Sequence, residues 1–204
     1  DDFGNPAYDE NSAPSDFNFH LMNPGRIFTM ANEQYRYLED MGNGDHLIIR
    51  NDAIRNVTWN DQETELISWY GQLDPTVQAI VQPVANDFTT GEVADAAVTF
   101  DGGRWIPNNL EGDVASDITQ IVSGGTRRAF ALSLADVTRL SGEGLGFPNH
   151  AQRGSTALGW WWLRTPAPGT NAWPVTTAGN LAGINARAVS TTSGGVRPAL
   201  ILHQ

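Results

Sequence analysis

Two apolar motifs, each with an arginine one or two residues before a proline, enclose a polar stretch of the chain. The first motif is Gly159–Pro166, with three consecutive tryptophans, and the second is Gly194–Leu202. Between them, Ala, Thr, Asn, Gly and Ser predominate. Aromatic and branched residues favour strands, whereas small polar residues favour turns and loops. The pattern is typical of a rigid frame that displays an adaptable surface, and it favours binding over catalysis.

The composition predicts one sizeable domain. The chain has 204 residues, of which 40% are hydrophobic, with seven Trp and eight Phe to build a core. A domain of this length buries about 70% of the surface of its unfolded chain. The absence of cysteine excludes disulfides, thiolate-bound zinc and a cysteine nucleophile. The chain begins at Asp1 without a methionine. We therefore expect a piece of a longer product, with any secretion signal or anchor outside it.

The charge of the chain disfavours several kinds of partner. The formal net charge is −11 and the isoelectric point is near 4.6, so phosphate backbones and anionic membranes are repelled. All twelve basic residues are Arg, which excludes Schiff-base and P-loop lysine chemistry. No apolar run approaches the roughly 20 residues needed to span a bilayer. We expect neither nucleic-acid binding nor direct membrane insertion.

The pattern along the chain predicts an irregular leader over residues 1–25 and a single α+β domain over residues 26–204. Asn43-Gly44 separates two β-prone runs and indicates a hairpin turn. The predicted strands are Ile27–Met30, Tyr35–Leu38, Leu47–Arg50, Ala129–Leu132 and Val196–Leu202.

Short helices and long loops complete the prediction. Asn60 is a candidate N-cap with Glu63 as its capping-box partner. Asp74-Pro75 starts a second short helix, and Ser133 caps a third that runs to Leu140. Residues 86–125 are rich in Gly, Asn and Asp and read as a long loop region, with a short helix near 113–121.

Specific residues carry a resemblance to a known family. They are Trp161–Pro166, then Val175, Gly179 and Val189, and finally Gly195–Leu200. They resemble a bacterial domain of unknown function that recurs in surface and secreted proteins, with W-W-L-R-[ST]-P and G-V-R-P-A-L as its signature. The resemblance covers roughly residues 26–204.

The resemblance implies a fold and a function. The family is similar to the C-type-lectin-like fold, in the version shared by formylglycine-generating enzymes and the variable proteins of diversity-generating retroelements. In those proteins the segment before a G-x-R-P strand presents the ligand-contacting side chains, and here that segment is 167–194. The resemblance implies a non-enzymatic module outside the cell, on a cell surface or a phage particle, that binds a protein or glycan ligand. Whether a retroelement diversified its codons stays open.

The candidate contact residues of this segment are those that no packing pattern requires. Short hydroxyls and amides form adaptable hydrogen bonds, and one aromatic supplies contact area at a low entropic cost. A solvated loop that binds nothing is the alternative. The candidates are Thr170, Asn171, Trp173, Thr176, Thr177, Asn180, Asn185, Arg187, Thr191 and Thr192.

The aromatic and basic side chains of the two motifs have a structural interpretation. Trp160, Trp161 and Trp162 can stack sugars, but core packing explains one or two of them better, because alternate residues of a strand face opposite sides. Arg164 and Arg197 can bind a carboxylate. We expect instead that both bind loop carbonyls and a buried acid.

No cofactor is expected, with calcium as the one open alternative. Residues 59–61 spell the Trp-Asn-Asp of the calcium site in sugar-binding lectins, but we interpret them as a helix cap. Loop acids can gather a calcium ion, and the candidates are Asp101, Glu111, Asp113 and Asp117. The histidines lack metal-site spacing and do not support a metal triad; they are His20, His46, His150 and His203.

Two other functions stay open at this point. The domain can be a structural, pilus-like subunit that assembles with copies of itself. Alternatively, two loop carboxylates can act as a glycoside hydrolase, although no pair stands out from the sequence.

Overall fold

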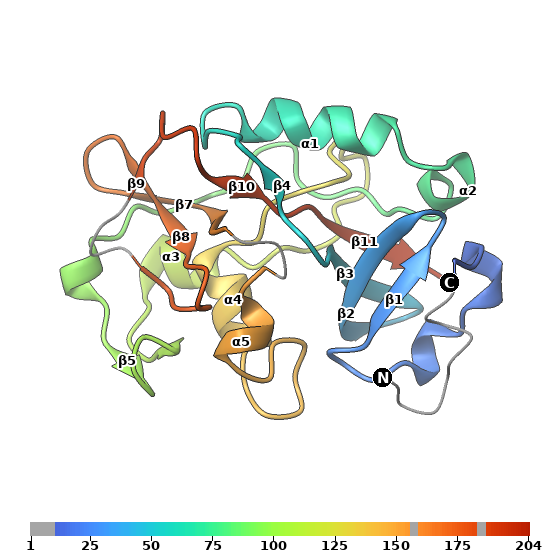
Figure 1. Ribbon diagram of the computed structural model, residues 1–204, viewed down its shortest axis with the longest axis horizontal. Helices are drawn as coiled ribbons and strands as arrows, with labels where there is room; N and C mark the ends of the chain where they lie inside the picture. The colour runs from blue at the N-terminus through green and yellow to red at the C-terminus, as the bar shows by residue number, and fades with distance from the viewer. Residues whose placement is uncertain (1–10, 156–158, 183–186) are drawn as a thin grey trace.

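The computed structural model describes residues 11–155, 159–182 and 187–204, with the backbone alone for Arg187 and Ala188. They form an α+β fold of small sheets and short helices (Figure 1). The helices and 3-10 turns are η2 (Pro14–Asp16), η3 (Phe19–Leu21), α1 (Gln62–Gly71), α2 (Pro75–Gln78), η4 (Asp95–Ala97), α3 (Gly112–Ser116), α4 (Leu134–Leu140) and α5 (His150–Arg153). The strands are β1 (Ile27–Met30), β2 (Glu33–Gly42), β3 (Asp45–Arg50), β4 (Ile54–Arg55), β5 (Phe100–Asp101), β6 (Ile106–Pro107), β7 (Trp161–Ala167), β8 (Asn171–Val175), β9 (Arg187–Ala188), β10 (Gly195–Val196) and β11 (Ala199–His203).

Two small sheets organise these strands. The first has the order β1-β2-β3-β11 and is antiparallel throughout, with the last strand of the chain beside the β2–β3 hairpin. The second has the order β4-β10-β7-β8-β9, and only its β10–β7 pair is parallel. A two-stranded β5-β6 ribbon lies apart at the lower left of Figure 1.

The predicted hairpin at Asn43-Gly44 is confirmed. Both residues have positive φ, 57° and 80°, as the mirror-image turns between twisted antiparallel strands require. The strands predicted on either side are found as β2 and β3, which pair from Tyr35↔Arg50 to Gly42↔Asp45. This hairpin is the centre of the first sheet.

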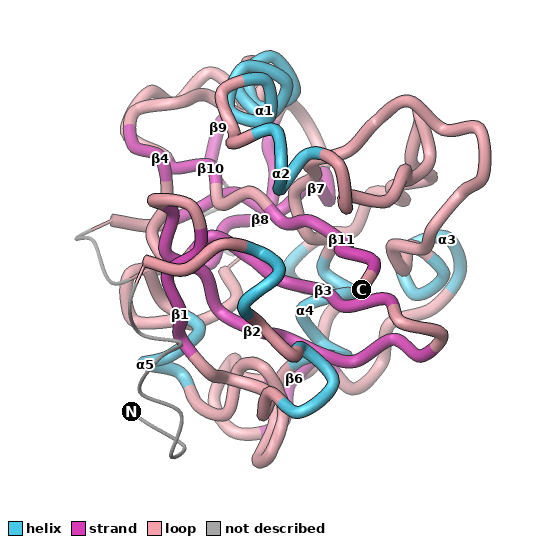
Figure 2. The backbone as a smooth tube through the Cα atoms, turned by 90° about the vertical axis from the view of Figure 1, so that its right-hand side faces the viewer, coloured by secondary structure: helices cyan, strands magenta, loops and turns pink. Residues whose placement is uncertain are grey.

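The first sheet is buried on both faces. On β3, Leu47 and Ile49 belong to one hydrophobic cluster with Leu134 of α4, whereas Ile48 belongs to the other with Leu66 of α1. Successive strand residues point to opposite faces, so each face has its own core. Figure 2 shows α1 end-on above β11, with α4 on the other side of the sheet.

One predicted helix start is confirmed and another is wrong. Ser133 caps α4 in a capping box with Asp136, and its Oγ accepts from the Asp136 amide at 3.0 Å. The N-cap of α1 is Asp61 rather than Asn60, and it makes no side-chain capping bond. The backbone N–H of Asn60 instead donates to the Val189 carbonyl at 3.2 Å. A contact from 129 residues away therefore sets this turn.

Two predicted strands differ in the structure. Ala129–Leu132 is not a strand, because it pairs only at Phe130, through an isolated bridge to Ala199. Val196–Leu202 is split into β10 and β11 at Arg197-Pro198. Proline has no N–H for a ladder hydrogen bond, so the chain changes sheets here.

Residues 11–25 contain two 3-10 turns, η2 and η3, and contribute to the core. Phe17 and Phe19 are buried and stack with ring centroids 5.4 Å apart. The Phe19 amide donates to Oε1 of Gln204 at 3.0 Å. From Asn11 onwards this segment packs against the first sheet.

Candidate functional site

Arg164 of β7 is fixed by a buried ionic network. Its guanidinium donates to Asp117 at 2.6 Å, to Thr119 Oγ1 at 2.6 Å and to Asp136 at 3.3 Å. A further bond goes to the Ala131 carbonyl. Burial raises the pKa of the Asp117 carboxyl, while the hydrogen bonds from Arg164 oppose this shift. The prediction that Arg164 binds loop carbonyls and a buried acid is confirmed.

Arg197 of the second motif is held by carbonyls. Its guanidinium donates to the carbonyls of Arg50 at 2.8 Å and Arg153 at 3.0 Å. Burial lowers the pKa of Arg197 to about 9, so the group is still a cation at neutral pH. The expected carbonyl bonds are confirmed, but no bond to a buried acid is found for Arg197 within the described residues.

The motif tryptophans belong mainly to the core. Trp161 and Trp162 are both fully buried, because both faces of β7 are covered. The Trp162 indole donates to the Val57 carbonyl at 2.9 Å. Trp160 is half-buried and its ring meets that of Trp162 edge-on, with centroids 4.6 Å apart. Core packing for two of the three is confirmed.

Trp173 is not a surface contact residue, which corrects the sequence-based prediction. Its side chain is 0% exposed, and its indole donates to the Val93 carbonyl at 2.9 Å. All of Ala172–Val175 is buried, because β8 is an inner strand of its sheet and the loop from 86 to 100 covers it. Trp173 is part of the frame.

Three loops, which follow β4, β7 and β9, are joined to one another by backbone hydrogen bonds. The Val189 amide donates to the Thr170 carbonyl at 2.9 Å, and the Val189 carbonyl accepts from Asn60. The Val57 amide donates to the Gly194 carbonyl at 2.9 Å. We call the surface of residues 56–61, 168–171 and 188–193 the three-loop surface. In Figure 1 it lies at the upper left, where the β9–β10 loop rises beside the start of α1.

The three-loop surface displays small polar side chains. Asn56, Asn60, Thr170, Ser190 and Thr192 are exposed. Asn171 and Thr191 are half-buried. The side-chain amide of Asn171 stabilises the preceding turn by donating to the Pro168 carbonyl at 3.0 Å. Four predicted contact residues thus lie here: Thr170, Asn171, Thr191 and Thr192.

A polar pocket adjoins this surface. It has a volume of about 360 Å³ and is lined by Asn56, Val57, Asp61, Thr64, Glu65 and Ser68. All but Asn56 and Val57 come from one face of the start of α1, at spacings of three and four residues. The sequence pattern gave no indication that this segment joins the 167–194 loops, because the joining hydrogen bonds are long-range.

Three predicted contact residues lie at the other end of β8. They belong to one turn, in which the backbone N–H of Asn180 donates to Thr176 Oγ1 at 3.1 Å. The three residues are Thr176, Thr177 and Asn180. Strand residues rise about 3.3 Å each, so Thr176 is about 20 Å from Thr170. The 167–194 segment therefore presents two separate surfaces.

The remaining two predicted contact residues are less fully described. Asn185 lies outside the described residues. The backbone of Arg187 pairs with Ala172 at the edge of the sheet.

The predicted calcium acids do not converge. Across the described residues, no group of three or more His, Asp or Glu side chains is placed to hold a metal ion. Asp117 is engaged by Arg164, and Asp101 accepts from Asn108 at 2.9 Å. Asn60 and Asp61 belong to the three-loop surface and the start of α1.

Three histidines that looked isolated in sequence lie around one end of the first sheet. His20 pairs with Asp40 and His203 with Asp45, each at 2.9 Å. Between them His46 is buried and shares a 2.7 Å hydrogen bond with the Tyr37 hydroxyl. Burial lowers the pKa of His46, with Asp40, Asp45, His20 and His203 as weaker influences.

Comparison with known proteins places the chain in a family. The chain belongs to the family described as Domain of unknown function (DUF6273), whose model matches residues 36–204. That match covers both arginine motifs and the three-loop surface. No curated protein and no solved structure shows significant similarity to the chain. In the described residues, no helix is both long and apolar enough to cross a membrane.

Proposed function

We propose that this domain is a non-enzymatic binding module that recognises a glycan or protein ligand through the three-loop surface. The observation that carries the proposal is the backbone linkage Thr170–Val189–Asn60, which joins exposed polar side chains of three loops. Loops held on a rigid scaffold are where recognition concentrates. We further propose that the domain works outside the cell, on a cell surface or a phage particle.

The chemistry of the surface favours a hydroxyl-rich or polar ligand. Hydroxyl and amide groups donate and accept, and the adjoining pocket adds the carboxylates of Asp61 and Glu65 as acceptors. Trp59, in the first of the three loops, is half-buried, and its indole N–H donates to the Leu163 carbonyl at 3.0 Å. An indole face held in this way suits the apolar face of a sugar ring.

The proposed fold is the C-type-lectin-like one, in its formylglycine-generating-enzyme version. The motif resemblance supports it, as does the first sheet, in which the last strand returns to the strands that open the domain. In proteins of that fold the segment before the G-x-R-P strand binds ligand, and here its 188–193 part contributes to the three-loop surface.

An array of glycans and surface proteins tests the proposed function. Wild type should capture at least one ligand class, and the double variant T170A/T192A should lose it. T177A is the matched control, since Thr177 is also an exposed threonine of the 167–194 segment but lies at the other end of β8. Equal capture by all three proteins would place the binding site elsewhere.

Sequencing the same locus in sibling strains tests retroelement diversification of this surface. Changes at adenine-bearing codons should concentrate in 168–171 and 188–193 and spare the codon of Trp173. Uniform drift over 167–194 contradicts diversification without affecting the binding proposal.

A glycoside hydrolase is the second candidate function. Asp61 and Glu65 are one helical turn apart and line one pocket, and paired carboxylates beside a sugar are what glycoside hydrolysis needs. Turnover of a glycan panel that is removed by both D61N and E65Q supports this candidate. Binding without turnover supports the binding module.

A further inference from the structure

A second pocket lies along the opposite side of α1. It has a volume of about 290 Å³ and is formed between α1 and the segment Thr126–Ala129. Helix residues Glu63, Leu66, Ile67 and Tyr70 line it, at spacings that place them on one helix face. Its volume is near the lower end of the about 300–1,000 Å³ of small-molecule sites.

The helix side of this pocket is largely apolar. Leu66 is buried at its base and Tyr70 is half-buried. Ile67 is 73% exposed, the largest exposed fraction among the big hydrophobic side chains described. An isoleucine left this exposed beside a pocket offers apolar area to a ligand.

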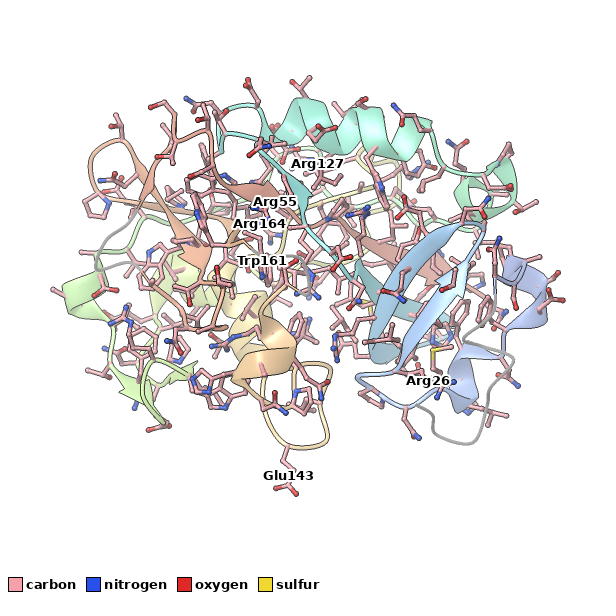
Figure 3. The ribbon with its side chains drawn as sticks, in the orientation of Figure 1. Arg26, Arg55, Arg127, Glu143, Trp161 and Arg164 are labelled. Atoms are coloured by element: carbon pink, nitrogen blue, oxygen red, sulfur yellow. The ribbon has the colours of Figure 1, made fainter. Side chains whose placement is uncertain are left out.

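The opposite wall carries two adjacent arginines, Arg127 and Arg128, which differ in their contacts. Arg127 pairs with Glu63 at 3.0 Å, and its guanidinium lies 4.6 Å from the centroid of the Phe88 ring; Figure 3 shows Arg127 beside α1. Nη1 of Arg128 is buried and has no hydrogen-bond partner in the described part of the chain. Arg128 is half-buried and also lines the pocket, so it adds a positive charge to this wall beyond the Arg127–Glu63 pair.

The arginine segment is fixed in place before any ligand binds. The Val84 amide donates to the Arg127 carbonyl at 2.9 Å. The Thr126 amide and hydroxyl both donate to Asn86 Oδ1, at 2.6 and 2.9 Å. A wall fixed in this way is preorganised, which lowers the entropic cost of ordering it around a ligand.

We propose that this pocket binds a small monocarboxylate with an apolar body. The carboxylate accepts hydrogen bonds from Arg128, and the apolar body lies against Leu66, Ile67 and Tyr70. Charge-assisted bonds from a guanidinium to a carboxylate are about twice as strong as neutral ones. The site faces away from Asp61 and Glu65 across α1, so it is independent of the three-loop surface and goes beyond the proposed function.

Calorimetric titration with matched probes tests this site. The probes are 3-phenylpropionate, its uncharged isostere 3-phenylpropionamide, and N-acetylphenylalanine as a mimic of a peptide C-terminus. We expect at least one acid to bind and the amide to bind at least about tenfold more weakly. Binding of 3-phenylpropionate alone indicates free acids as the source, and binding of N-acetylphenylalanine alone indicates peptide termini. No binding by either acid, or equal binding of acid and amide, overturns the proposal.

Variants assign the binding to this pocket. R128Q should weaken acid binding by about tenfold or more, whereas R139Q, which removes a positive charge from α4, should not. Because Nη1 of Arg128 has no partner among the described residues, R128Q should keep the thermal midpoint of the wild type.

I67S is a second variant on an exposed position and should weaken binding severalfold. Unchanged affinity in R128Q or in I67S overturns the assignment. T170A/T192A should retain acid binding, which separates this test from that of the three-loop surface.

Discussion

Arg164 and Thr170 are six residues apart, yet they represent two different regions of the molecule. Arg164 is 3% exposed and donates to Asp117, Thr119, Ala131 and Asp136. Thr170 is exposed on a turn that is joined to other loops by backbone hydrogen bonds. The first region fixes the frame through side chains, whereas the second is fixed through its backbone and leaves its side chains available. Substitutions should therefore affect stability in the first region and binding in the second.

Replacement of Arg164 should have the largest effect on stability. R164A leaves the Asp117 carboxylate buried without its cation and leaves Asp136 with only the 3.9 Å contact to Arg139, which costs about 3–5 kcal/mol of unfolding free energy. R164K should fare little better, because lysine lacks the planar fork that reaches several acceptors. Urea unfolding measures both variants. A loss below about 1 kcal/mol would mean that the network is not part of the frame.

Substitution of Trp173 tests whether this residue belongs to the core, as the structure shows, rather than to the binding surface that the sequence predicted. W173F should lower the free energy of unfolding by about 2 kcal/mol, because it removes the bond to the Val93 carbonyl and leaves a cavity. W160F, at a half-buried tryptophan, should cost less. If W173F is as stable as wild type and loses ligand instead, Trp173 belongs to the binding surface after all.

Sequence alone predicted the parts of the frame that depend on local signals. The Asn43-Gly44 turn and the Ser133 helix cap were predicted, and both are set by residues within a few positions of one another. The arginines beside prolines also had a limited set of roles in a folded chain, and Arg164 fulfils the expected one. These predictions needed no knowledge of which elements pack together.

The candidate site was predicted only in part, because it depends on long-range contacts. Trp173 lies among small polar residues in the sequence, and nothing local shows that residues 86–100 cover it. Asn60 has the sequence pattern of a helix cap, but in the structure its backbone N–H donates to the Val189 carbonyl. The three-loop surface joins residues 56–61 to loops more than 100 residues later in the chain, and the pocket between α1 and Thr126–Ala129 joins segments more than 50 residues apart.

His46 extends the comparison to pH. Its pKa is lowered by burial from the ordinary 6.5, so around and below that pH the unfolded chain binds a proton that the folded chain does not. The free energy of unfolding should therefore fall as the pH falls from 7 towards 5. H46N, which can still bond to the Tyr37 hydroxyl, should flatten this dependence in thermal unfolding series. An unchanged slope in H46N would contradict the assignment of this dependence to His46.

Substitutions on the three-loop surface should have the smallest effect on stability. T170A/T192A removes two exposed hydroxyls and should change the free energy of unfolding by less than about 0.5 kcal/mol. T177A should behave alike. A larger change in the double variant would show that these hydroxyls support the frame.

The affinity of the captured ligand for these same variants tests the central claim most directly. Calorimetry on wild type, T170A/T192A and T177A should show at least about a tenfold rise in Kd for the double variant, since lost hydrogen bonds at a buried contact cost about 1 kcal/mol each. T177A should match wild type, and all three should share one melting temperature. Equal affinity in T170A/T192A and wild type, or a loss confined to T177A, would contradict the assignment of binding to the three-loop surface.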